Sequence, residues 1–408
     1  MRFKSLLLTS MMVALLASCN KDNEEVTVKL GAILDLSGNN SDDGNSAKAA
    51  IELSLDEING LYEEVGSPVR FTCEFEDTGM DTIAAMNAAE GMYNKGIRIL
   101  VAGPSTSAEL KAVQSFVNEN KMLVLNCFST APSLAVWNDY IFRILPDDNG
   151  QAQALIRMMQ LDSIRVVVPV WTDDTYGKGL YDAVRQRLQN AGGVMLPGIN
   201  YKPGATNFAE IMSMADTRVK EVIDLYGISS VGVILISYQE SAGLMEAAAD
   251  QTYLSGVKWY GCDANVGKSG LLANRKASGF AAAVRFKGPI MGIGTATAVP
   301  EMAAKIMDQV KGITGFTPRF YCVNAFDAVK IISQAYNIVR SYDTQLIKEI
   351  LPSVCEAYNY AGISRKLNEA GDLKTANYIF YTIYIKQSGS YWDTYATYMA
   401  EGDFILLK

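Results

Sequence analysis

Three consecutive hydroxyl side chains, Ser105, Thr106 and Ser107, follow a short apolar stretch of the chain. That stretch, residues 97–101, predicts a buried strand that a Gly-Pro pair ends, and residues 108–117 predict the next helix. Hydroxyl groups at a helix N-terminus, beside free backbone N–H groups and the positive end of the helix dipole, suit a small carboxylate or a similar anion. An ordinary helix cap is the alternative interpretation of the same residues.

A second polar loop favours a ligand site over a simple cap. Residues 121–126 predict the next strand, and Phe128, Ser129 and Thr130 come directly after it. Because neighbouring parallel strands end at the same edge of a sheet, the two loops should lie side by side. Open α/β sheets bind ligands at that edge. The sequence therefore predicts a small-molecule site built on two strand-end loops.

Composition excludes several classes of function. The 408 residues include 36 basic and 44 acidic side chains, a net charge of −8, which argues against nucleic acid as a partner. The absence of histidine removes Ser-His and Cys-His nucleophiles and imidazole metal sites. Enzymes that use only carboxylates or lysine remain possible, but we find one candidate carboxylate rather than a pair. We therefore expect no enzyme activity, no metal and no cofactor.

The N-terminus predicts export and lipidation. Residues 1–18 combine a basic start with a short apolar run, and Leu-Ala-Ser before Cys19 resembles a bacterial lipobox. We expect residues 1–18 to be a lipoprotein signal peptide, Cys19 to be acylated, and residues 19–25 to form the tether. The protein would then be extracytoplasmic, either in the periplasm or at the cell surface. The lipid anchor alone would hold it at the bacterial cell envelope. The alternatives are a plain signal peptide with an incidental cysteine and an uncleaved membrane span.

Strand and helix patterns alternate along the rest of the chain, which predicts parallel sheets covered on both faces. The alternation of strands and helices pauses near residue 142 and then restarts, which predicts that the chain is divided between two lobes. We expect residues 26–142 plus 270–360 to form the N-terminal lobe and residues 143–269 plus 361–408 to form the C-terminal lobe. Five cysteines after Cys19, without a CxxC pattern, predict mostly buried free thiols, although two disulfides are possible.

Motifs at residues 31–38, 50–59, 103–107, 129–133 and 324–329 are each weak, but their order and spacing are specific. Together they resemble the type I periplasmic binding proteins, in particular the leucine/isoleucine/valine-binding (receptor ligand-binding) family. The similarity runs from about residue 26 to the end. It implies an α/β fold of two doubly wound parallel-sheet lobes, joined by a hinge of several crossovers, that close on a ligand.

The resemblance also implies roles for individual residues. The first lobe would hold an amino acid's α-carboxylate, Phe128 would direct its backbone carbonyl toward the α-amino group, and Asp263 would pair with the α-ammonium. Tyr176 and Tyr238 would supply aromatic cover from the second lobe. The expected carboxylate-binding residues are Ser105, Thr106, Ser107, Ser129 and Thr130. One position departs from the family: Asp43, in a predicted polar loop (residues 35–45) before a helix predicted over residues 46–59, stands where an aromatic side chain is common. This acidic loop argues against assuming a branched-chain aliphatic ligand. It is compatible with a more polar or cationic ligand, and also with a position in solvent.

These observations predict a solute-binding lipoprotein that captures an amino acid or a similar small polar carboxylate and delivers it to an ABC-type permease. Its mechanism would be binding followed by hinge closure, with no covalent chemistry. A ligand sensor, or an envelope lipoprotein that binds another protein through the cleft, is compatible with the same fold.

Overall fold

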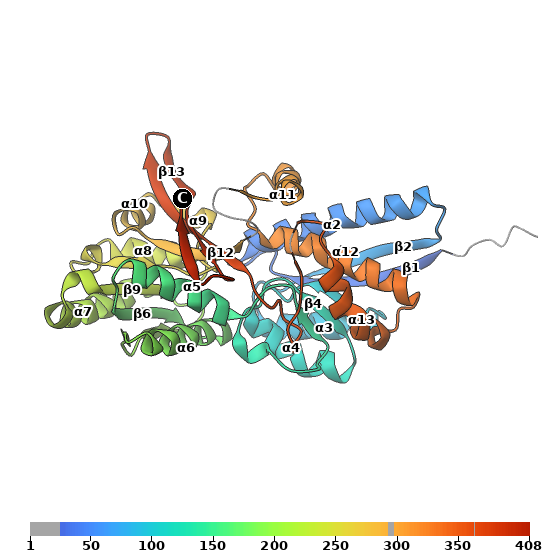
Figure 1. Cartoon of the computed structure of the whole chain (residues 1–408), viewed down its shortest axis with the longest axis horizontal. Coiled ribbons are helices and arrows are strands. Elements are labelled where there is room, and N and C mark those ends of the chain that lie inside the picture. The colour runs from blue at the N-terminus through green and yellow to red at the C-terminus, as the bar shows by residue number, and fades with distance from the viewer. Residues whose placement is uncertain (1–24, 293–297, 363) are drawn as a thin grey trace, which may run out of the picture.

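The structure, a computed structural model, describes residues 25–292, 298–362 and 364–408, which form two α/β lobes arranged along the long axis of the molecule (Figure 1). The predicted signal peptide, Cys19 and nearly all of the tether lie outside these residues. Within the described part of the chain, no helix is both long enough and apolar enough to cross a membrane.

The first lobe contains, in the described chain, a five-stranded parallel sheet in the order β2-β1-β3-β4-β5. Its strands are β1 (Val26–Leu34), β2 (Val69–Asp77), β3 (Ile99–Ala102), β4 (Leu123–Asn126) and β5 (Ile141–Arg143). The apolar side chains of β1 alternate, so that Leu30 and Ala32 belong to the core under α2 and α12, whereas Ile33 belongs to the core under α3 and α4. The covering helices are α2 (Ser41–Glu64), α12 (Tyr321–Val339), α3 (Thr82–Asn94) and α4 (Ser107–Glu119).

The second lobe is built on a larger, mixed sheet in the order β14-β13-β12-β11-β10-β9-β6-β7, with β8 also paired to β6. Its strands are β6 (Val166–Thr172), β7 (Val194–Met195), β8 (Ile199–Tyr201), β9 (Val231–Ile236), β10 (Lys258–Tyr260), β11 (Lys287–Gly292), β12 (Asn377–Lys386), β13 (Gly389–Met399) and β14 (Phe404–Leu407). Strands β6 to β11 pair in parallel, and β12 adds to β11 in the antiparallel direction. Strands β12 and β13 form a hairpin, with Lys386 opposite Gly389 at its turn.

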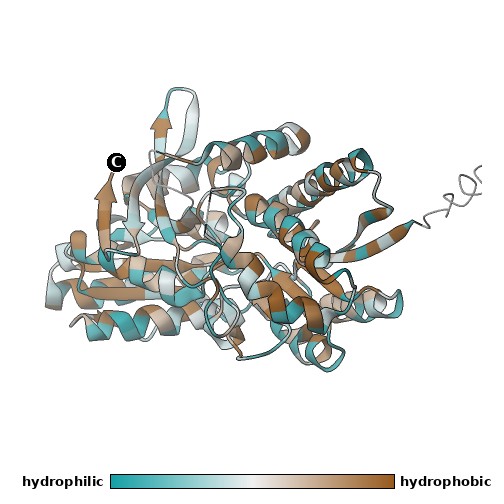
Figure 2. Cartoon of the chain, turned by 45° about the vertical axis from the view of Figure 1, so that its right-hand side comes forward, coloured by the Kyte–Doolittle hydropathy of each residue, from teal (hydrophilic) through white to brown (hydrophobic). Residues whose placement is uncertain are grey.

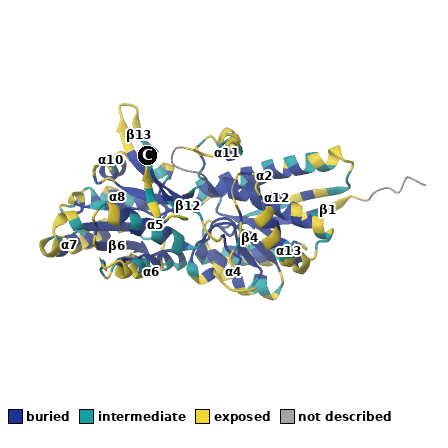
Figure 3. Cartoon of the chain, in the orientation of Figure 1, coloured by how far each residue is buried: buried dark blue, intermediate teal, exposed yellow. Residues whose placement is uncertain are grey.

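Helices cover both faces of this sheet as well. The helices are α5 (Asp148–Leu161), α6 (Thr175–Asn190), α7 (Phe208–Tyr226), α8 (Ser241–Ala248), the short α9 (Ser269–Ala273) and α10 (Arg275–Ala283). The alternating side chains of β6 are buried on both faces of the sheet. Val167 packs in the core shared with α5 and α6, whereas Val166 and Val168 pack in the core shared with α7, α8 and α10. In both lobes the central strands are apolar (Figure 2) and buried, whereas the outer faces of the helices are exposed (Figure 3).

The chain passes between the lobes after β5, after β11 and before β12, which confirms the expected fold class of two lobes with several crossovers. The return to the first lobe comes later than residue 270, where we expected it. Helices α9 and α10 pack against α8, and β11 extends the second sheet beside β10. The return is made by α11 (Glu301–Thr314), which packs against α2 and α12, followed by α13 (Thr344–Ala357) on α12.

A buried ion pair ties the first and last crossovers together. Arg143, at the end of β5, places its Nε 2.5 Å from Oδ1 of Asp372, and neither side chain is more than 2% exposed. The backbone N–H of Leu373 donates to the carbonyl of Arg143 over 2.8 Å. The two crossing segments therefore form one hydrogen-bonded unit at the hinge. The five cysteines of the described chain are free thiols, as expected, and only Cys73 is not fully buried.

Candidate functional site

A small pocket lies between the lobes, where the carboxyl ends of both sheets face each other. Its cavity measures about 30 Å³. The first lobe contributes Asn40, Ser105, Thr106, Ser107, Phe128, Thr130, Arg319 and Tyr321, and the second lobe contributes Tyr176, Tyr238, Asp263 and Ala264. We call this cavity the cleft pocket. Eight of the nine ligand-binding residues that the sequence suggested line it, and Ser129 does not.

Helix α4 begins at the cleft pocket because its N-terminus is capped locally. Oγ1 of Thr106 accepts the backbone N–H of Glu109 over 3.2 Å, and the same hydroxyl donates to Oε2 of Glu109 over 2.7 Å. Thr106 therefore acts as the helix cap that was the alternative interpretation of this motif. A side chain at Gly103 would place its Cβ 1.7 Å from the carbonyl oxygen of Ile33, so only glycine lets this turn lie against β1.

Ser105 and Ser107 differ from Thr106 because their hydroxyl hydrogens remain available. Oγ of Ser105 accepts the backbone N–H of Asp35 over 2.9 Å. Oγ of Ser107 accepts the N–H groups of Thr130 and Ala131, both over 3.2 Å. In each case the oxygen is held by a backbone donor, so the O–H can donate to a ligand in the pocket. The two serines thus form a pair of oriented donors at a helix N-terminus.

The second loop contributes to the pocket through residues on either side of Ser129. The N–H groups of Phe128 and Ser129 both donate to Oδ1 of Asn126, which shapes the loop after β4. The hydroxyl of Ser129 donates to the carbonyl of Pro104 over 3.3 Å, away from the pocket lining. Ser129 therefore joins the two loops, and its expected contact with a ligand's carboxylate stays a prediction. The carbonyl of Thr130 accepts the N–H of Asp148 over 2.8 Å and links the loop to α5.

Asp263 supplies the carboxylate on the opposite wall. It follows β10 and is 5% exposed. The hydroxyl of Tyr176 donates to its Oδ1 over 2.6 Å, and the hydroxyl of Tyr321 donates to its Oδ2 over 2.8 Å. Because Tyr176 belongs to the second lobe and Tyr321 to the first, this carboxylate connects the lobes. Asp263 caps no helix, since α9 begins only at Ser269.

A second carboxylate lies behind Asp263. The side-chain amide of Gln151 donates to Oδ1 of Asp148 over 3.0 Å and to Oδ1 of Asp263 over 2.9 Å. Asp148 is completely buried, and burial together with the charge of Asp263 raises the pKa of its carboxyl well above the usual range. The raised pKa favours the neutral form of Asp148 beside Asp263. Asp148 was not among the predicted site residues, and nothing in the sequence indicated this pairing.

Aromatic rings close the sides of the cleft pocket. The rings of Tyr176 and Tyr238 lie 5.5 Å apart, and those of Phe128 and Tyr321 also lie 5.5 Å apart. All four side chains are less than 9% exposed. Polar groups in the pocket are therefore surrounded by apolar surface, which strengthens electrostatic interactions with a bound molecule.

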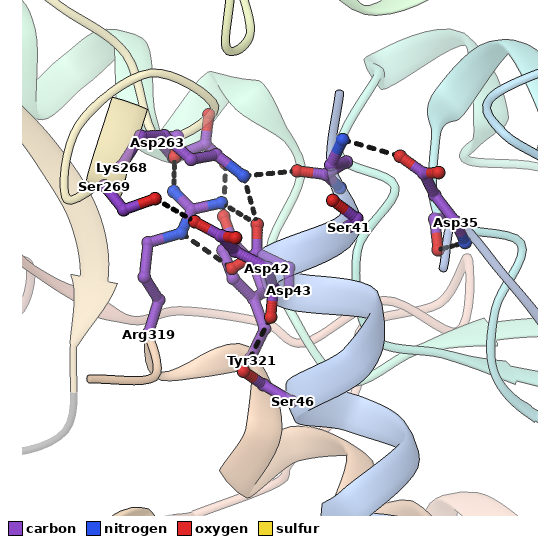
Figure 4. A network of polar contacts seen from close by, with 12 residues as sticks. Asp35, Ser41, Asp42, Asp43, Ser46, Asp263, Lys268, Ser269, Arg319 and Tyr321 are labelled. Carbon is purple, nitrogen blue, oxygen red and sulfur yellow. Dashed lines mark hydrogen bonds and ion pairs between the residues drawn. The ribbon is translucent and has the colours of Figure 1, made fainter. Parts of the chain in front are cut away.

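Asp43 belongs to a buried ion cluster rather than to an open acidic loop (Figure 4). Helix α2 begins at Ser41, five residues earlier than the pattern indicated, so Asp43 lies in its first turn. Its carboxylate binds the guanidinium of Arg319 and accepts from Nζ of Lys268 over 2.6 Å. Burial alone raises the pKa of Asp43, but the two cations together hold it well below its usual range.

We call Asp43, Lys268 and Arg319 the ion triad. Lys268 comes from the second lobe and is 1% exposed, and its Nζ also donates to Asn40 of the first lobe over 2.5 Å. Arg319 donates from the first lobe to the backbone carbonyls of Asp263 and Val266 in the second. The triad therefore joins the lobes along one side of the cleft pocket. Lys268, Arg319 and Tyr321 were not among the predicted site residues, because a charged or tyrosyl side chain carries no local sign of its distant partner.

The family described as "Receptor family ligand binding region" matches residues 46–378. The chain belongs to this family. It is a family of ligand-binding regions and not of enzymes, in agreement with the expectation that the cleft binds rather than catalyses.

Several individual proteins are similar to this chain over different lengths. The uncharacterized protein MJ1266 of Methanocaldococcus jannaschii is 26% identical, over 90% of this chain and 92% of its own. The Leu/Ile/Val-binding protein BraC3 of Rhizobium johnstonii is 27% identical, over 61% and 66%. The match to glutamate receptor 2.5 of Arabidopsis thaliana, at 28% identity, spans 19% of that receptor.

Solved structures confirm the fold. The crystal structure of the leucine binding protein LivK from Thermotoga maritima superposes with a TM-score of 0.73 at 18% sequence identity, covering 91% of this chain and 98% of that one. Two α/β lobes of the type I periplasmic binding protein fold are therefore shared between the two proteins.

Proposed function

We propose that the protein captures an amino acid, or a similarly small polar carboxylate, between its lobes. The observation that carries the proposal is the opposition of charge types across the cleft pocket. Two serine hydroxyls with free hydrogens lie at a helix N-terminus on one wall, and the Asp263 carboxylate lies on the other. A zwitterion presents a carboxylate to the first wall and an ammonium group to the second.

The ion triad supports a small ligand. Arg319 and Asn40 line the cleft pocket, and Arg319 is already bound to Asp43, so both side chains restrict the space beside a ligand. A cavity of about 30 Å³ in this arrangement favours the smallest ligands. We therefore favour glycine, alanine, serine and similarly small ligands over bulky aliphatic ones, although LivK and BraC3 are named for leucine and for leucine, isoleucine and valine.

The proposal includes delivery to an ABC-type permease, since solved structures with this fold include substrate-binding proteins of ABC transporters. It also includes an extracytoplasmic location with a lipid anchor at Cys19. A sensor that signals to a membrane partner uses the same cleft and the same closure. Cells that lack the protein distinguish the two roles, because a transport component is required for uptake of the radiolabelled ligand and a sensor is not.

Thermal unfolding against a panel of amino acids, small carboxylates and amines tests the ligand class. A ligand at a hundred times its dissociation constant adds about 2.7 kcal/mol to the free energy of unfolding. We expect a stabilising shift from a small amino acid, and none from the matching amine or carboxylic acid alone. If no zwitterion raises the unfolding temperature while a simple acid or amine does, the proposed division of the two walls is wrong.

A further inference from the structure

A second pocket, much larger than the cleft pocket, lies on the other side of the ion triad. Its cavity measures about 430 Å³, against about 30 Å³ for the cleft pocket. Arg319 lines both cavities, whereas its triad partners Asp43 and Lys268 line only the second pocket, so the triad lies between the two. A volume of several hundred Å³ with apolar walls is typical of small-molecule sites in proteins.

The walls of the second pocket come from both lobes. Its second-lobe wall is formed by strands β11, β12 and β13 and includes Ile290, Ile379, Tyr391 and Trp392. Met307 of α11 and Phe316, which follows that helix, form part of the first-lobe wall. Figure 1 shows α11 and the β12–β13 hairpin on either side of the region between the lobes. A molecule in this pocket would touch both lobes at once.

The charged groups that line the second pocket are already paired. Asp43 is bound by Lys268 and Arg319, and Oγ of Ser269 donates to Asp42 over 2.6 Å. The indole N–H of Trp392 donates to the carbonyl of Lys268 over 3.0 Å, so its ring offers only apolar contact. The two carboxylates and two cations at this wall sum to zero formal charge. A charged ligand would have to be desolvated here without a counter-ion, which is costly.

From this arrangement we propose that the second pocket binds a neutral, largely apolar or aromatic small molecule, independently of the ligand in the cleft pocket. The pocket's volume sets the size of the ligand, its aromatic and aliphatic walls set the chemistry, and the balanced charges exclude an ion. Because the ion triad separates the cavities, both ligands can be bound together.

The neutral aromatic amine N-phenyl-1-naphthylamine, which fluoresces when it enters apolar surroundings, is a suitable probe. We expect saturable binding of one molecule per chain to the purified protein. Met307→Trp fills the cavity from α11, and Thr317→Trp fills it from its exposed rim. Each variant should bind the probe at least tenfold more weakly. Met214→Trp, at a 52% exposed position on α7 far along the second lobe, is the matched control and should bind like the wild type.

Thermal unfolding and circular dichroism identify which variants are folded. If Met307→Trp does not fold, Thr317→Trp still tests the proposal. Unchanged affinity in a folded pocket variant, or binding that does not saturate, overturns the proposal. Asp263→Asn and Ser105→Ala should bind the probe normally, since they alter only the cleft pocket. Loss of probe binding in these two variants would show instead that the probe occupies the cleft pocket, and would also overturn the proposal. Neither result depends on whether an amino acid binds there.

Discussion

The two walls of the cleft pocket are built on different physical principles. The first-lobe wall presents hydroxyl groups and a helix N-terminus, with no net charge: Asp43 and Arg319 neutralise one another. The second-lobe wall presents one buried carboxylate, Asp263, held by two tyrosine hydroxyls and surrounded by aromatic rings. One wall can therefore recognise an anion through oriented dipoles, and the other can recognise a cation through a full charge.

This difference shows how a closing cleft can be selective without a metal or a strong cation. Hydroxyl donors and a helix dipole can bind a carboxylate at little desolvation cost, but they bind it weakly until the lobes close. A buried carboxylate is costly without a partner, so it favours closure around an ammonium group. Only a ligand with both groups satisfies both walls. The predictions below test this division, from the largest expected effect to the smallest.

Removing Asp43 should break the neutrality of the first wall. Asp43→Ala leaves Lys268 and Arg319 buried without their shared carboxylate, and such changes cost about 3–5 kcal/mol of stability. Denaturant unfolding should show this loss. Asp42→Ala is the matched control, because Asp42 is half-buried and bonds only to the hydroxyl of Ser269. Equal losses in the two variants would mean that the triad is not what stabilises this contact.

Neutralising Asp263 tests the charge of the second wall. Asp263→Asn keeps the shape of the side chain but removes the charge that faces the ligand's ammonium, and we expect affinity to fall by about 2–4 kcal/mol. Isothermal titration with the amino acid found in the thermal screen measures the change. Asp224→Asn, at an exposed position on α7, is the control and should bind normally. If Asp263→Asn binds the amino acid as tightly as the wild type, the proposed role of the Asp263 charge in recognising the ammonium group is wrong.

Ser105→Ala tests the first wall and should have a smaller effect. It removes one donor to the ligand's carboxylate and leaves the N–H of Asp35 without its acceptor, at a cost of about 1.5 kcal/mol in affinity. The same titration measures it, and Ser129→Ala should be close to neutral because Ser129 lies outside the pocket lining. A larger loss in Ser129→Ala than in Ser105→Ala would contradict the assigned roles.

The smallest effect concerns pH. Burial raises the pKa of Glu109, behind the first wall, to about 7, from the ordinary value of 4.5, with a further contribution from Asp35. A raised carboxyl pKa contributes stability that is present at low pH and lost as pH rises through the folded-state value. Between pH 6 and pH 8 this should lower the free energy of unfolding by about 1 kcal/mol. Glu109→Gln should remove this loss of unfolding free energy between pH 6 and pH 8. If the variant keeps the pH dependence of the wild type, Glu109 does not titrate in this window.

Local sequence signals were sufficient for much of the fold and for the positions of the loops. Apolar runs such as 97–101 and 121–126 predicted strands that the structure contains, and the Thr106 cap marks where α4 begins. These signals work because helix caps, strand periodicity and turns depend on residues close together in the chain. The lobe boundary at 270 was placed too early for the same reason, since only the pairing of β11 with β10 assigns residues 287–292 to the second sheet.

Only the tertiary structure decided which of these side chains meet and what charge they carry together. Ser129 and Ser105 have the same chemistry in the sequence, yet one joins two loops and the other lines the cleft pocket. Asp43 read as an acidic loop residue, but Lys268 and Arg319, more than two hundred residues away, neutralise it. Hydrogen bonds and ion pairs between distant segments leave no periodic trace in a single chain. The sequence by itself therefore determined the two-lobed scaffold and its loops, and folding determined the chemistry of the space between the lobes.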